Sequence, residues 1–529
     1  MIPMKRQQPS DGLRSPLPCI HGGGLGRGPK REEIFDAPTT PSLALPRSTG
    51  RGNKTTLLAL GLLTLSGCKV GPNYKRPEVP SAPAYKSPTT QTAGATMRQD
   101  WWKLYNDPTL TSLEESALKT NYDIAAAMQR VGQARQSAAI ANAGFYPVIT
   151  FNPQISRSRT PASSGGTGTI TGGGTVIAGT GSGGGHTRNV AQVPLDFNYE
   201  LDVWGRVRRN YEAAQATANA SAIDLAVVQQ TVTSDLAVDY FTLRSLDAQD
   251  AIIGRNVELY RKQVQLAKSQ NKAGLVGQTD VLQAQTLLDS TLAQQQDIQR
   301  QRADTEHAIA ILAGRAPVEL TVGFSPLTEE PPVVPAGLPG DLLRQRPDVA
   351  EAEQNLVAAN AQVGVATANF YPQFSLTGAL GFESTDIRHT FDWENRLWSI
   401  GAGAAAPIFN GGQLNAELNQ ARARYNELVA TYRGAILSAF RDVEDSLTDL
   451  RLRNEQGLVE DRAVNSARES ARLSELQYRQ GLTSYLQVID ADRTLLTNEL
   501  TAAQIREQRM ISSVLLIKAL GGGWEPAQR

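Results

Sequence analysis

The chain has 529 residues, of which 40% are hydrophobic, 20% charged and only 6% aromatic, and its formal net charge is zero. Two cysteines exclude a disulfide-rich scaffold, and the neutral total gives no basis for a nucleic-acid-binding protein. Residues 1–67 hold nine Lys/Arg and four Asp/Glu, which leaves a net charge of −5 on the rest of the chain. A basic leader before a mildly acidic body indicates export.

A short apolar run over residues 57–65 follows the basic residues Arg51 and Lys54. These nine residues are too few for a transmembrane helix, which needs about 20, but they suit the core of a signal peptide. We therefore predict a signal peptide over residues 51–67. Residues 1–50 are rich in Pro, Gly and Arg without periodicity, and we treat them as a non-native or disordered extension outside the fold.

The predicted signal peptide ends in Leu65-Ser66-Gly67-Cys68, which resembles the lipobox of bacterial lipoproteins. There the cysteine carries diacylglycerol and an amide-linked fatty acid such as palmitate, and several acyl chains together give a stable anchor. We predict that Cys68 is the lipidated start of an extended segment over residues 68–100. The alternative is a buried or unmodified cysteine after a chance apolar run. Lys69 stands where lipoproteins of the inner membrane commonly carry Asp, which favours the outer membrane.

The chain contains an internal repeat. The segment from Asn121 to Pro147 aligns with the segment from Arg346 to Pro372 at an offset of 225 residues. Further along, residues 272–284 align with residues 479–491 at an offset of 207. The first copy therefore holds 18 extra residues, which we place in the Gly/Ser/Thr-rich stretch 163–185, a predicted flexible extracellular loop.

Each copy predicts a helix, two strands, a long helix, a tight turn and a further helix. Repeat 1 is predicted to contain helices over 101–146, a β-hairpin over 147–204 and a long helical hairpin over 205–313. A linker over 314–340 leads to repeat 2, with a helix over 341–371, a β-hairpin over 372–410, a long helical hairpin over 411–520 and a tail over 521–529.

The predicted strands alternate apolar and polar residues. In the first copy the apolar positions are Val193, Leu195, Phe197, Tyr199, Leu201 and Val203, and in the second Phe374, Leu376, Gly378, Leu380 and Phe382 repeat the pattern more weakly. Strands of about ten residues that are apolar outside and polar inside match the wall of a transmembrane barrel. A soluble antiparallel sheet with one wet face would show the same alternation.

No proline interrupts residues 205–270 or 412–480, and apolar residues recur there every three or four positions. A helix of about 66 residues is about 100 Å long and must pack against other helices as a coiled coil. One chain supplies four predicted strands, too few to enclose a lumen, and open strand edges in lipid leave backbone groups unpaired. If the strands span a membrane, several chains must combine, and three chains would supply twelve strands.

Several motifs resemble those of TolC/OprM-like outer-membrane efflux lipoproteins, the NodT group. They are Cys68–Pro77, Trp101–Tyr105 with Asp107-Pro108, Glu200–Arg206, Leu338–Leu343 with Arg346–Asp348, and Pro407–Gly412. The resemblance runs in unbroken order from residue 65 to about residue 520. It implies a mainly α fold with a transmembrane β-barrel, in which a homotrimer forms a 12-strand barrel on a long α-helical coiled-coil tunnel in the periplasm.

The same resemblance implies a function and partners. The chain is expected to be a passive export duct for drugs or other small molecules in the bacterial outer membrane, as part of a tripartite multidrug efflux pump. Its expected partners are a periplasmic adaptor (membrane fusion) protein, an inner-membrane resistance-nodulation-division transporter, outer-membrane lipid and two further copies of the chain.

In this family the helix turns furthest from the membrane carry the gate and contact the adaptor. The matching residues here are Gly274, Leu275, Val276, Gly481, Leu482 and Thr483. Asp280 and Asp490 match aspartates near the periplasmic aperture, and rings of carboxylates favour cations. The alternative is that both are solvated charges near helix ends.

Tyr478 matches a tyrosine of the closing network in this family. Gln487 and Thr483 depart from TolC, which has an aspartate and an arginine at the corresponding positions. We therefore expect that other contacts hold the closed state in this chain, and that its block by cations is weak.

The sequence offers no catalytic or metal-binding pattern. The four histidines, His21, His186, His307 and His389, lie far apart without metal-ligand spacing, and the Gly-rich stretch lacks the Lys-Ser/Thr of a nucleotide loop. We expect no enzyme activity, no metal, no nucleic-acid partner and no cofactor beyond the covalent lipid on Cys68. A second hypothesis stays open, in which the chain is a lipid-anchored periplasmic coiled-coil structural or adaptor protein without a channel.

Overall fold

The computed structural model describes residues 69–79, 86, 99–159, 167–171, 175–179, 187–334 and 346–524, all within one unit, Leu65–Arg529. The predicted signal peptide, Cys68 and most of the predicted extended segment lie outside the described residues. So do residues 335–345 and 525–529, and the sequence-based expectations for all these segments stay predictions.

Repeat 1 begins with three helices, and side-chain caps set the starts of the last two. The three helices are η1 (Trp101–Tyr105), α2 (Pro108–Thr120) and α3 (Tyr122–Ala143). The Asp107 carboxylate accepts hydrogen bonds from the backbone N–H groups of Thr109 and Leu110 at 2.7 and 3.1 Å, and Asn121 caps α3 in the same way. Such caps satisfy the unpaired N–H groups of the first turn, so they define where each helix begins.

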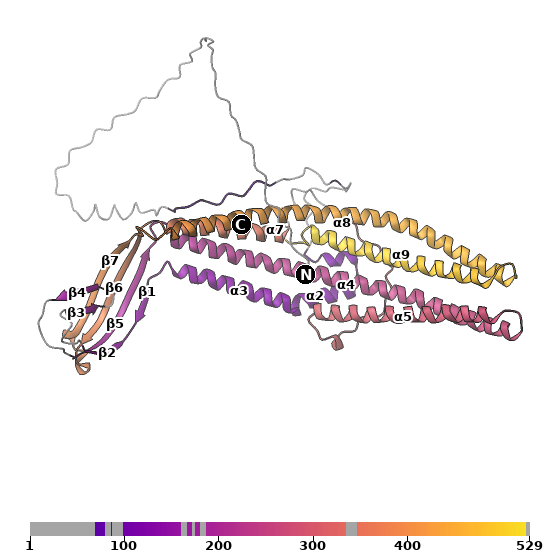
Figure 1. The fold of residues 1–529 in the computed structure, drawn as a ribbon, viewed down its shortest axis with the longest axis horizontal. Coiled ribbons are helices and arrows are strands. Elements are labelled where there is room, and N and C mark those ends of the chain that lie inside the picture. The colour runs from indigo at the N-terminus through magenta and orange to yellow at the C-terminus, as the bar shows by residue number, and fades with distance from the viewer. Residues whose placement is uncertain are drawn as a thin grey trace, which may run out of the picture. The chain divides into compact units, whose positions relative to one another are not determined.

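Four long helices form two helical hairpins. Helices α4 (Arg206–Lys272) and α8 (Gln413–Arg479) have 67 residues each, and their partners α5 (Gln278–Leu312) and α9 (Tyr485–Ala519) have 35 each. The equal lengths make the internal repeat visible. Helix α4 packs against both α5 and α9, so the second hairpin lies against the first (Figure 1). The short η2 (Pro317–Glu319) follows α5, and α7 (Pro347–Ala368) packs on α4 and α8.

The strands form an antiparallel sheet in which the two repeats meet. Its strands are β1 (Val148–Phe151), β2 (Gln154–Arg159), β5 (Thr187–Leu201), β6 (Gln373–Ser384) and β7 (Arg396–Ala405), in the order β1-β5-β6-β7 with β2 also paired to β5. The pairing of β5 with β6 joins the repeats. Two short turns, η3 (Ile387–His389) and η4 (Trp393–Asn395), connect β6 to β7.

The structure corrects two details of the predicted first β-hairpin. The outgoing strand is not continuous but divides into β1 and β2 around Asn152 and Pro153, because proline has no N–H group for the ladder. The Gly-rich stretch is not wholly a loop, since β3 (Thr167–Thr171) pairs with β4 (Thr175–Gly179) in a separate two-stranded sheet. Both segments are rich in Thr, Val and Ile, residue types that favour strands.

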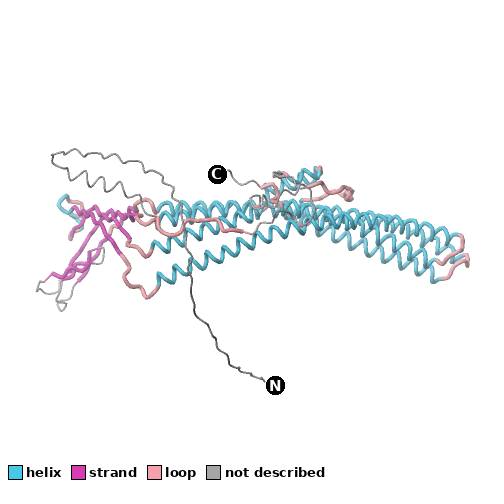
Figure 2. Tube along the Cα trace, turned by 90° about the horizontal axis from the view of Figure 1, so that it is seen from above, coloured by secondary structure: helices cyan, strands magenta, loops and turns pink. Residues whose placement is uncertain are grey.

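The sheet lies at one end of the long helices, and the turns that join α4 to α5 and α8 to α9 lie at the other end (Figures 1 and 2). Between these ends the apolar core forms three clusters along the helices, which include Leu236, Ile253 and Ile436. None of the described helices has both the length and the apolar character that a bilayer-spanning helix needs.

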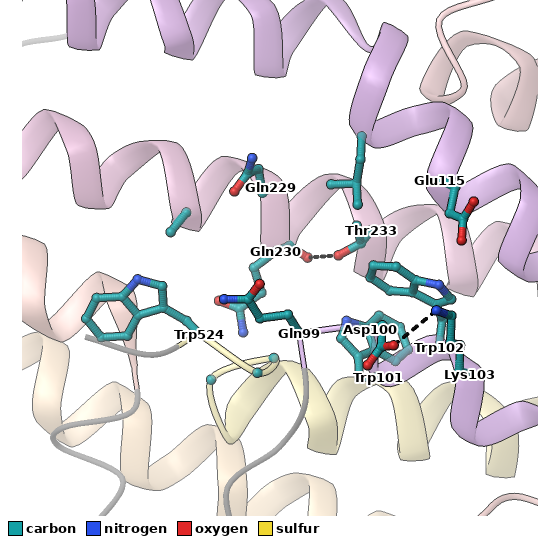
Figure 3. A pocket seen from close by; sticks show the side chains of 15 residues that line it. Gln99, Asp100, Trp101, Trp102, Lys103, Glu115, Gln229, Gln230, Thr233 and Trp524 are labelled. Atoms are coloured by element: carbon teal, nitrogen blue, oxygen red, sulfur yellow. Dashed lines mark hydrogen bonds and ion pairs between the residues drawn. The ribbon is translucent and has the colours of Figure 1, made fainter. Parts of the chain in front are cut away.

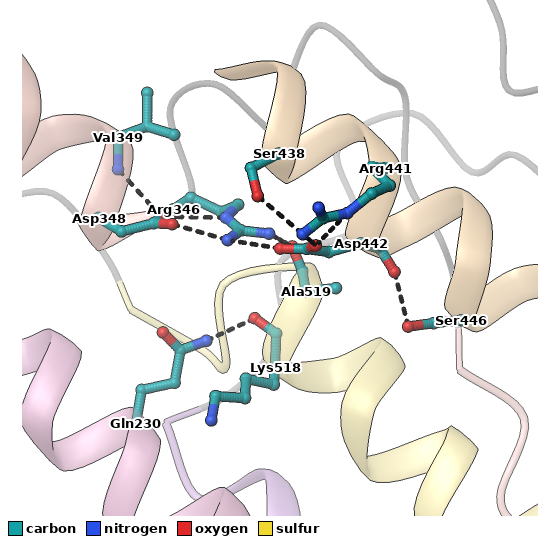
Figure 4. A network of polar contacts seen from close by, with 10 residues as sticks. All are labelled: Gln230, Arg346, Asp348, Val349, Ser438, Arg441, Asp442, Ser446, Lys518 and Ala519. Atoms are coloured by element: carbon teal, nitrogen blue, oxygen red, sulfur yellow. Dashed lines mark hydrogen bonds and ion pairs between the residues drawn. The ribbon is translucent and has the colours of Figure 1, made fainter. Parts of the chain in front are cut away.

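A buried arginine joins three helices of repeat 2 (Figure 4). Arg346 immediately precedes α7, and its Nη2 atom lies 2.6 Å from Asp348 Oδ2 and 3.2 Å from Asp442 Oδ2 of α8. Its Nη1 atom donates to the carbonyl of Ala519, at the end of α9, at 3.3 Å. The guanidinium fork therefore fixes the start of α7 and the end of α9 on α8.

Candidate functional sites at the two ends of the helices

The turns at the far ends of the two helical hairpins have the same backbone geometry. In the first turn, Gly274 N donates to Asn271 O and Leu275 N donates to Gln270 O, both at 2.9 Å, and the same pair of bonds surrounds Gly481. This arrangement needs a left-handed residue just after the helix. Gly274 and Gly481 supply it with φ of +72° and +74°. A Cβ atom at either glycine would meet nothing within 4 Å, so the backbone angle alone favours glycine.

Two leucines project from these turns. Leu275 is 75% exposed and Leu482 is 73% exposed, whereas Val276 and Thr483 are half-buried. The predicted tip residues therefore do lie on the turns, with one exposed leucine on each hairpin. Apolar side chains exposed at matching positions suit contact with another protein.

The structure places two of the predicted aperture residues near each other. Asp280 lies in the first turn of α5, and Tyr478 lies near the end of α8. Burial raises the pKa of the Tyr478 hydroxyl, and the nearby Asp280 carboxylate raises it further. A charged residue of repeat 1 thus lies close enough to Tyr478 of repeat 2 to act on its hydroxyl.

The other predicted aperture residues lie on α9 or just before it. Asp490 and Gln487 are exposed on this helix, and the Thr483 hydroxyl donates to Gln487 Oε1. The two positions that differ from TolC therefore bond to each other within one hairpin and do not reach across to the other hairpin.

Apart from Tyr478, sequence analysis did not identify the polar side chains that join the hairpins. The Tyr478 hydroxyl donates to Gln270 Oε1 of α4 at 3.1 Å. The Tyr485 hydroxyl donates to Gln263 Oε1 at 3.2 Å, and Gln263 Nε2 donates to Asp492 Oδ2 at 3.0 Å. We call this region, formed by Tyr260, Gln263, Gln270, Tyr478, Tyr485 and Asp492, the hairpin contact.

Besides Tyr478, one other member of the hairpin contact stands out in the sequence pattern. Asp492 follows Ile489 by three positions and precedes Leu496 by four, so a carboxylate falls within the apolar stripe of α9. Its side chain is only 6% exposed, and burial raises its pKa. Gln263 and Gln270 had no such signal, because glutamine occurs throughout these helices.

At the opposite end of the helices, one face of the sheet carries exposed apolar side chains. Phe151, Leu195, Leu380 and Trp398 occupy paired positions across β1, β5, β6 and β7. Directly paired residues lie on the same face of a sheet, and these four are between 47% and 69% exposed. A continuous exposed apolar row of this kind marks a surface that contacts another protein or a membrane.

The first described residues lie at the junction between strands and helices. The Lys69 ammonium lies 2.6 Å from Glu212 near the start of α4. The fully buried Arg209 side chain donates to the carbonyl of Gly71 at 3.3 Å and to Asn73 Oδ1 at 2.9 Å. The buried guanidinium is therefore satisfied mainly by the segment that directly follows Cys68.

Close packing fixes the same segment on α7. Gly71 has φ of +89°, and a Cβ atom there would lie 2.6 Å from the Cα atom of Gly364. The side-chain amide of Asn360 donates to the carbonyl of Pro72 at 3.0 Å. Both contacts require the chain to pass directly over α7.

A cavity of about 450 Å³ lies midway, where η1, α2, α4 and the residues after α9 meet (Figure 3). Trp101, Trp102 and Trp524 line it, and Asp100 and Lys103 form an ion pair of 3.1 Å beside it. It holds none of the predicted tip or aperture residues. Within the described ranges, no group of three or more His, Cys, Asp or Glu side chains is placed to hold a metal ion.

Comparison with known proteins gives consistent matches. The profile of the outer membrane efflux protein family matches residues 113–315 and 338–522. The chain is 32% identical over 474 residues to the probable efflux pump outer membrane protein TtgC of Pseudomonas putida. This alignment covers 88% of this chain and 95% of that protein. The chain is also 34% identical over 428 residues to the pyoverdine export outer membrane protein OpmQ of Pseudomonas aeruginosa. This alignment covers 81% of this chain and 88% of that protein.

Solved structures agree. The outer-membrane channel OprN matches with a TM-score of 0.77 and 31% identity, over 87% of this chain and 100% of that one. The CmeC outer membrane channel of Campylobacter jejuni shares the fold, with a TM-score of 0.80 at 24% identity over 87% of this chain and 96% of that one. The predicted fold class, a mainly helical chain that carries the strands of an outer-membrane channel, is confirmed.

These matches also decide between the two functions that the sequence left open, because the relatives are outer-membrane components of efflux pumps and not periplasmic adaptors. The chain belongs to the outer membrane efflux protein family, and it is the outer-membrane channel component of an efflux pump.

Proposed function

We propose that three copies of this chain form a passive export duct for small molecules, lipid-anchored in the outer membrane and opened at its helical tips by partner proteins. The observation that carries the proposal is the exposed apolar row of Phe151, Leu195, Leu380 and Trp398 on a sheet with open edges. In lipid, the unpaired edges of β1, β2 and β7 must be closed by further strands. Three chains close a barrel of twelve strands, with the long helices extending from it into the periplasm.

The proposed lipid on Cys68 has support from the residues that follow it. Lys69 lies beside Gly205, between the end of β5 and the start of α4, since a Cβ atom on Gly205 would lie 3.2 Å from the Lys69 Cα atom. If the strands span the membrane, this junction lies at its periplasmic surface. Acyl chains on the preceding cysteine would then enter the bilayer directly.

The proposed opening site is the helical tips. The exposed Leu275 and Leu482 give a periplasmic adaptor an apolar contact on each hairpin, with Gly274, Val276, Gly481 and Thr483 shaping the turns. Six hairpins, two from each chain, would surround the aperture. In this proposal the duct is passive, and an inner-membrane resistance-nodulation-division transporter supplies the energy for export.

The duct is tested by single-channel recording of the purified protein in a planar bilayer, after its mass in detergent has been measured. We expect a trimer with discrete conducting steps. A monomer or dimer that never inserts, in a preparation that is folded by circular dichroism, would contradict the proposal.

The anchor is tested separately with Cys68→Ser. We expect this variant to lose its acyl chains by mass spectrometry but to remain in the outer-membrane fraction, because the barrel holds it there. Release of the variant into the periplasm as a soluble protein would contradict the membrane-spanning sheet.

The aperture is tested with Asp280→Ala combined with Asp490→Ala. We expect a higher resting conductance, because in the proposed trimer these carboxylates would form rings that bridge neighbouring helices at the aperture. Conductance and antibiotic leak equal to those of the unmodified protein would show that these carboxylates do not gate the duct.

A further inference from the structure

A carboxyl group is buried in the hairpin contact, where it joins the two repeats. Asp492 of α9 lies in the apolar stripe that also contains Ile489 and Leu496. Gln263 Nε2 of α4 donates to its Oδ2 atom at 3.0 Å, so this bond runs from repeat 1 to repeat 2. A carboxyl group in apolar surroundings is costly for the fold, which makes this position informative.

The hydrogen bond between Gln263 and Asp492 is the first of a series of contacts that leads to the tips. Gln263 also accepts a hydrogen bond from the Tyr485 hydroxyl at 3.2 Å. The Tyr485 ring lies 5.3 Å from the Tyr478 ring, and the Tyr478 hydroxyl reaches Gln270 Oε1 at 3.1 Å. The backbone carbonyl of Gln270 closes the first tip turn. A movement at Asp492 therefore acts on the residues that hold the tip.

This arrangement occurs once in each chain. At the offset of 207 residues, Asp492 corresponds to Gln285, Tyr485 to Gln278 and Gln263 to Ser470. Gln285 is bonded within its own hairpin, where its Oε1 atom accepts from Lys268 Nζ at 3.4 Å. In the proposed trimer, the contact of α8 with α5 of the next chain would therefore lack the carboxyl, the tyrosine and the bridging glutamine.

We infer that Asp492 is a positioning residue of the gate, which holds the two hairpins of one chain together through Gln263 while it is protonated and loosens them when it is ionised. This inference rests on the proposed duct and adds a proton-dependent control of its opening.

The groups around Asp492 decide whether the duct opens as pH rises or as pH falls. Burial raises its pKa most; the hydrogen bond from Gln263 lowers it, and Glu475 of α8 raises it. Glu475 itself pairs with Arg479 at 2.5 Å. The titratable or charged groups that surround the contact also include Tyr260 of α4, Asp280 of α5, Tyr478 of α8, and Tyr485, Arg493 and Glu499 of α9.

The buried Tyr260 hydroxyl has no hydrogen-bond partner among the described residues, so it does not compensate a charge on Asp492. An ionised Asp492 would therefore have one hydrogen bond, from Gln263, and little solvation while the hairpins touch, and it would gain solvation when they part. A raised pKa in the closed state means that closure is favoured at low pH and weakens as pH rises through that pKa.

The test records resting conductance of the full-length trimer in planar bilayers between about pH 5 and about pH 8, a range that spans raised carboxyl pKa values. In the unmodified protein we expect conductance to increase with pH. The increase should be up to about tenfold for each pH unit by which the pKa of Asp492 is higher in the closed hairpins than in the parted ones. In Asp492→Asn we expect low conductance at every pH, because the amide oxygen still accepts from Gln263 but cannot ionise.

Two further variants separate this role from a structural one. Asp492→Ala removes the acceptor, so we expect high conductance at every pH. Asp289→Asn makes the same chemical change on an exposed face of α5 and should keep the pH profile of the unmodified protein. Trimer mass and circular dichroism identify any variant that fails to fold. If Asp492→Ala fails to fold, Asp492→Asn still tests the proposal, because asparagine keeps the side-chain size and the oxygen that accepts from Gln263.

The outcomes are distinguishable. If neither the unmodified protein nor the Asp280→Ala, Asp490→Ala double variant conducts, the proposed duct fails. If the unmodified protein conducts but Asp492→Asn keeps the same pH profile, the duct stands and the role of Asp492 is overturned.

Discussion

The Tyr478 hydroxyl on α8 donates a hydrogen bond to the Gln270 side chain on α4 at 3.1 Å. The backbone carbonyl of Gln270 accepts at the same time from Leu275 N at 2.9 Å in the first tip turn. One glutamine therefore links a tip of repeat 1 to the tyrosine next to the tip of repeat 2. Parting of the hairpins must break the side-chain bond, whereas the backbone bond stays within its own hairpin.

Replacement of Tyr478 by Phe should increase leak through the duct. The change removes one side-chain hydrogen bond worth about 1 kcal/mol, which favours the parted hairpins about fivefold. Resting conductance and sensitivity to a large antibiotic would measure it. Tyr122→Phe is the matched control, because that tyrosine is 79% exposed on α3. Equal leak in both variants would contradict a role for the Tyr478–Gln270 bond.

Glycine-to-alanine changes at the tip and within the helix should have opposite signs. Gly481 has φ of +74°, so Gly481→Ala should destabilise its turn by about 1 kcal/mol. Gly434 lies within α8 with nothing within 4 Å of an added Cβ atom, so Gly434→Ala should stabilise the protein by about 0.5–1 kcal/mol. Thermal unfolding in detergent tests both changes, and a shift of the same sign would refute this account of the turn.

Replacement of Arg209 by Ala should release the segment that follows Cys68. The buried guanidinium bonds Gly71, Asn73 and the half-buried Glu212, and its loss should cost about 2–3 kcal/mol. Limited proteolysis between residues 69 and 79, followed by mass spectrometry, would detect the release. Arg135→Ala on the exposed face of α3 is the control, and identical cleavage in the two variants would show that Arg209 does not hold the segment.

The stability of the fold should decrease as pH rises from about 4 to about 6, partly because of Asp239 on α4. Burial, with a smaller contribution from Asp235, raises the pKa of Asp239 to about 6. The unfolded chain loses this proton near its ordinary pKa of about 3.9, so within this window the folded state holds more protons. Its stabilisation is present at low pH and is lost as pH passes through about 6.

Asp239→Asn should therefore flatten this part of the stability profile and raise the unfolding temperature near neutral pH. Thermal unfolding measured across the window tests the prediction. Asp461→Asn, on the exposed face of α8, serves as the comparison. If the two variants show the same slope against pH, Asp239 is not the titrating group.

The regular elements could be predicted because their patterns are local. The absence of proline over residues 205–270 and 412–480 predicted two helices of about 66 residues, and the structure has two of 67. The glycines at 274 and 481 suited the turns through their backbone freedom. The alternation in β5 and β6 indicated which residues share a face. The interruption of the first strand and the β3–β4 pair were missed, because the glycine-rich composition obscured a short β-branched pattern.

The sequence by itself determined the repeats, the hairpins and the strand faces, since each depends on the spacing of neighbouring residues, and the family resemblance indicated the residues on the tips. Only the tertiary structure decided which polar side chains meet. Gln263 of α4 and Asp492 of α9 are 229 positions apart, and a glutamine gives no local sign of its partner. Their pairing depends on the register in which α4 packs against α9, and that register is set by the whole apolar contact between the two repeats.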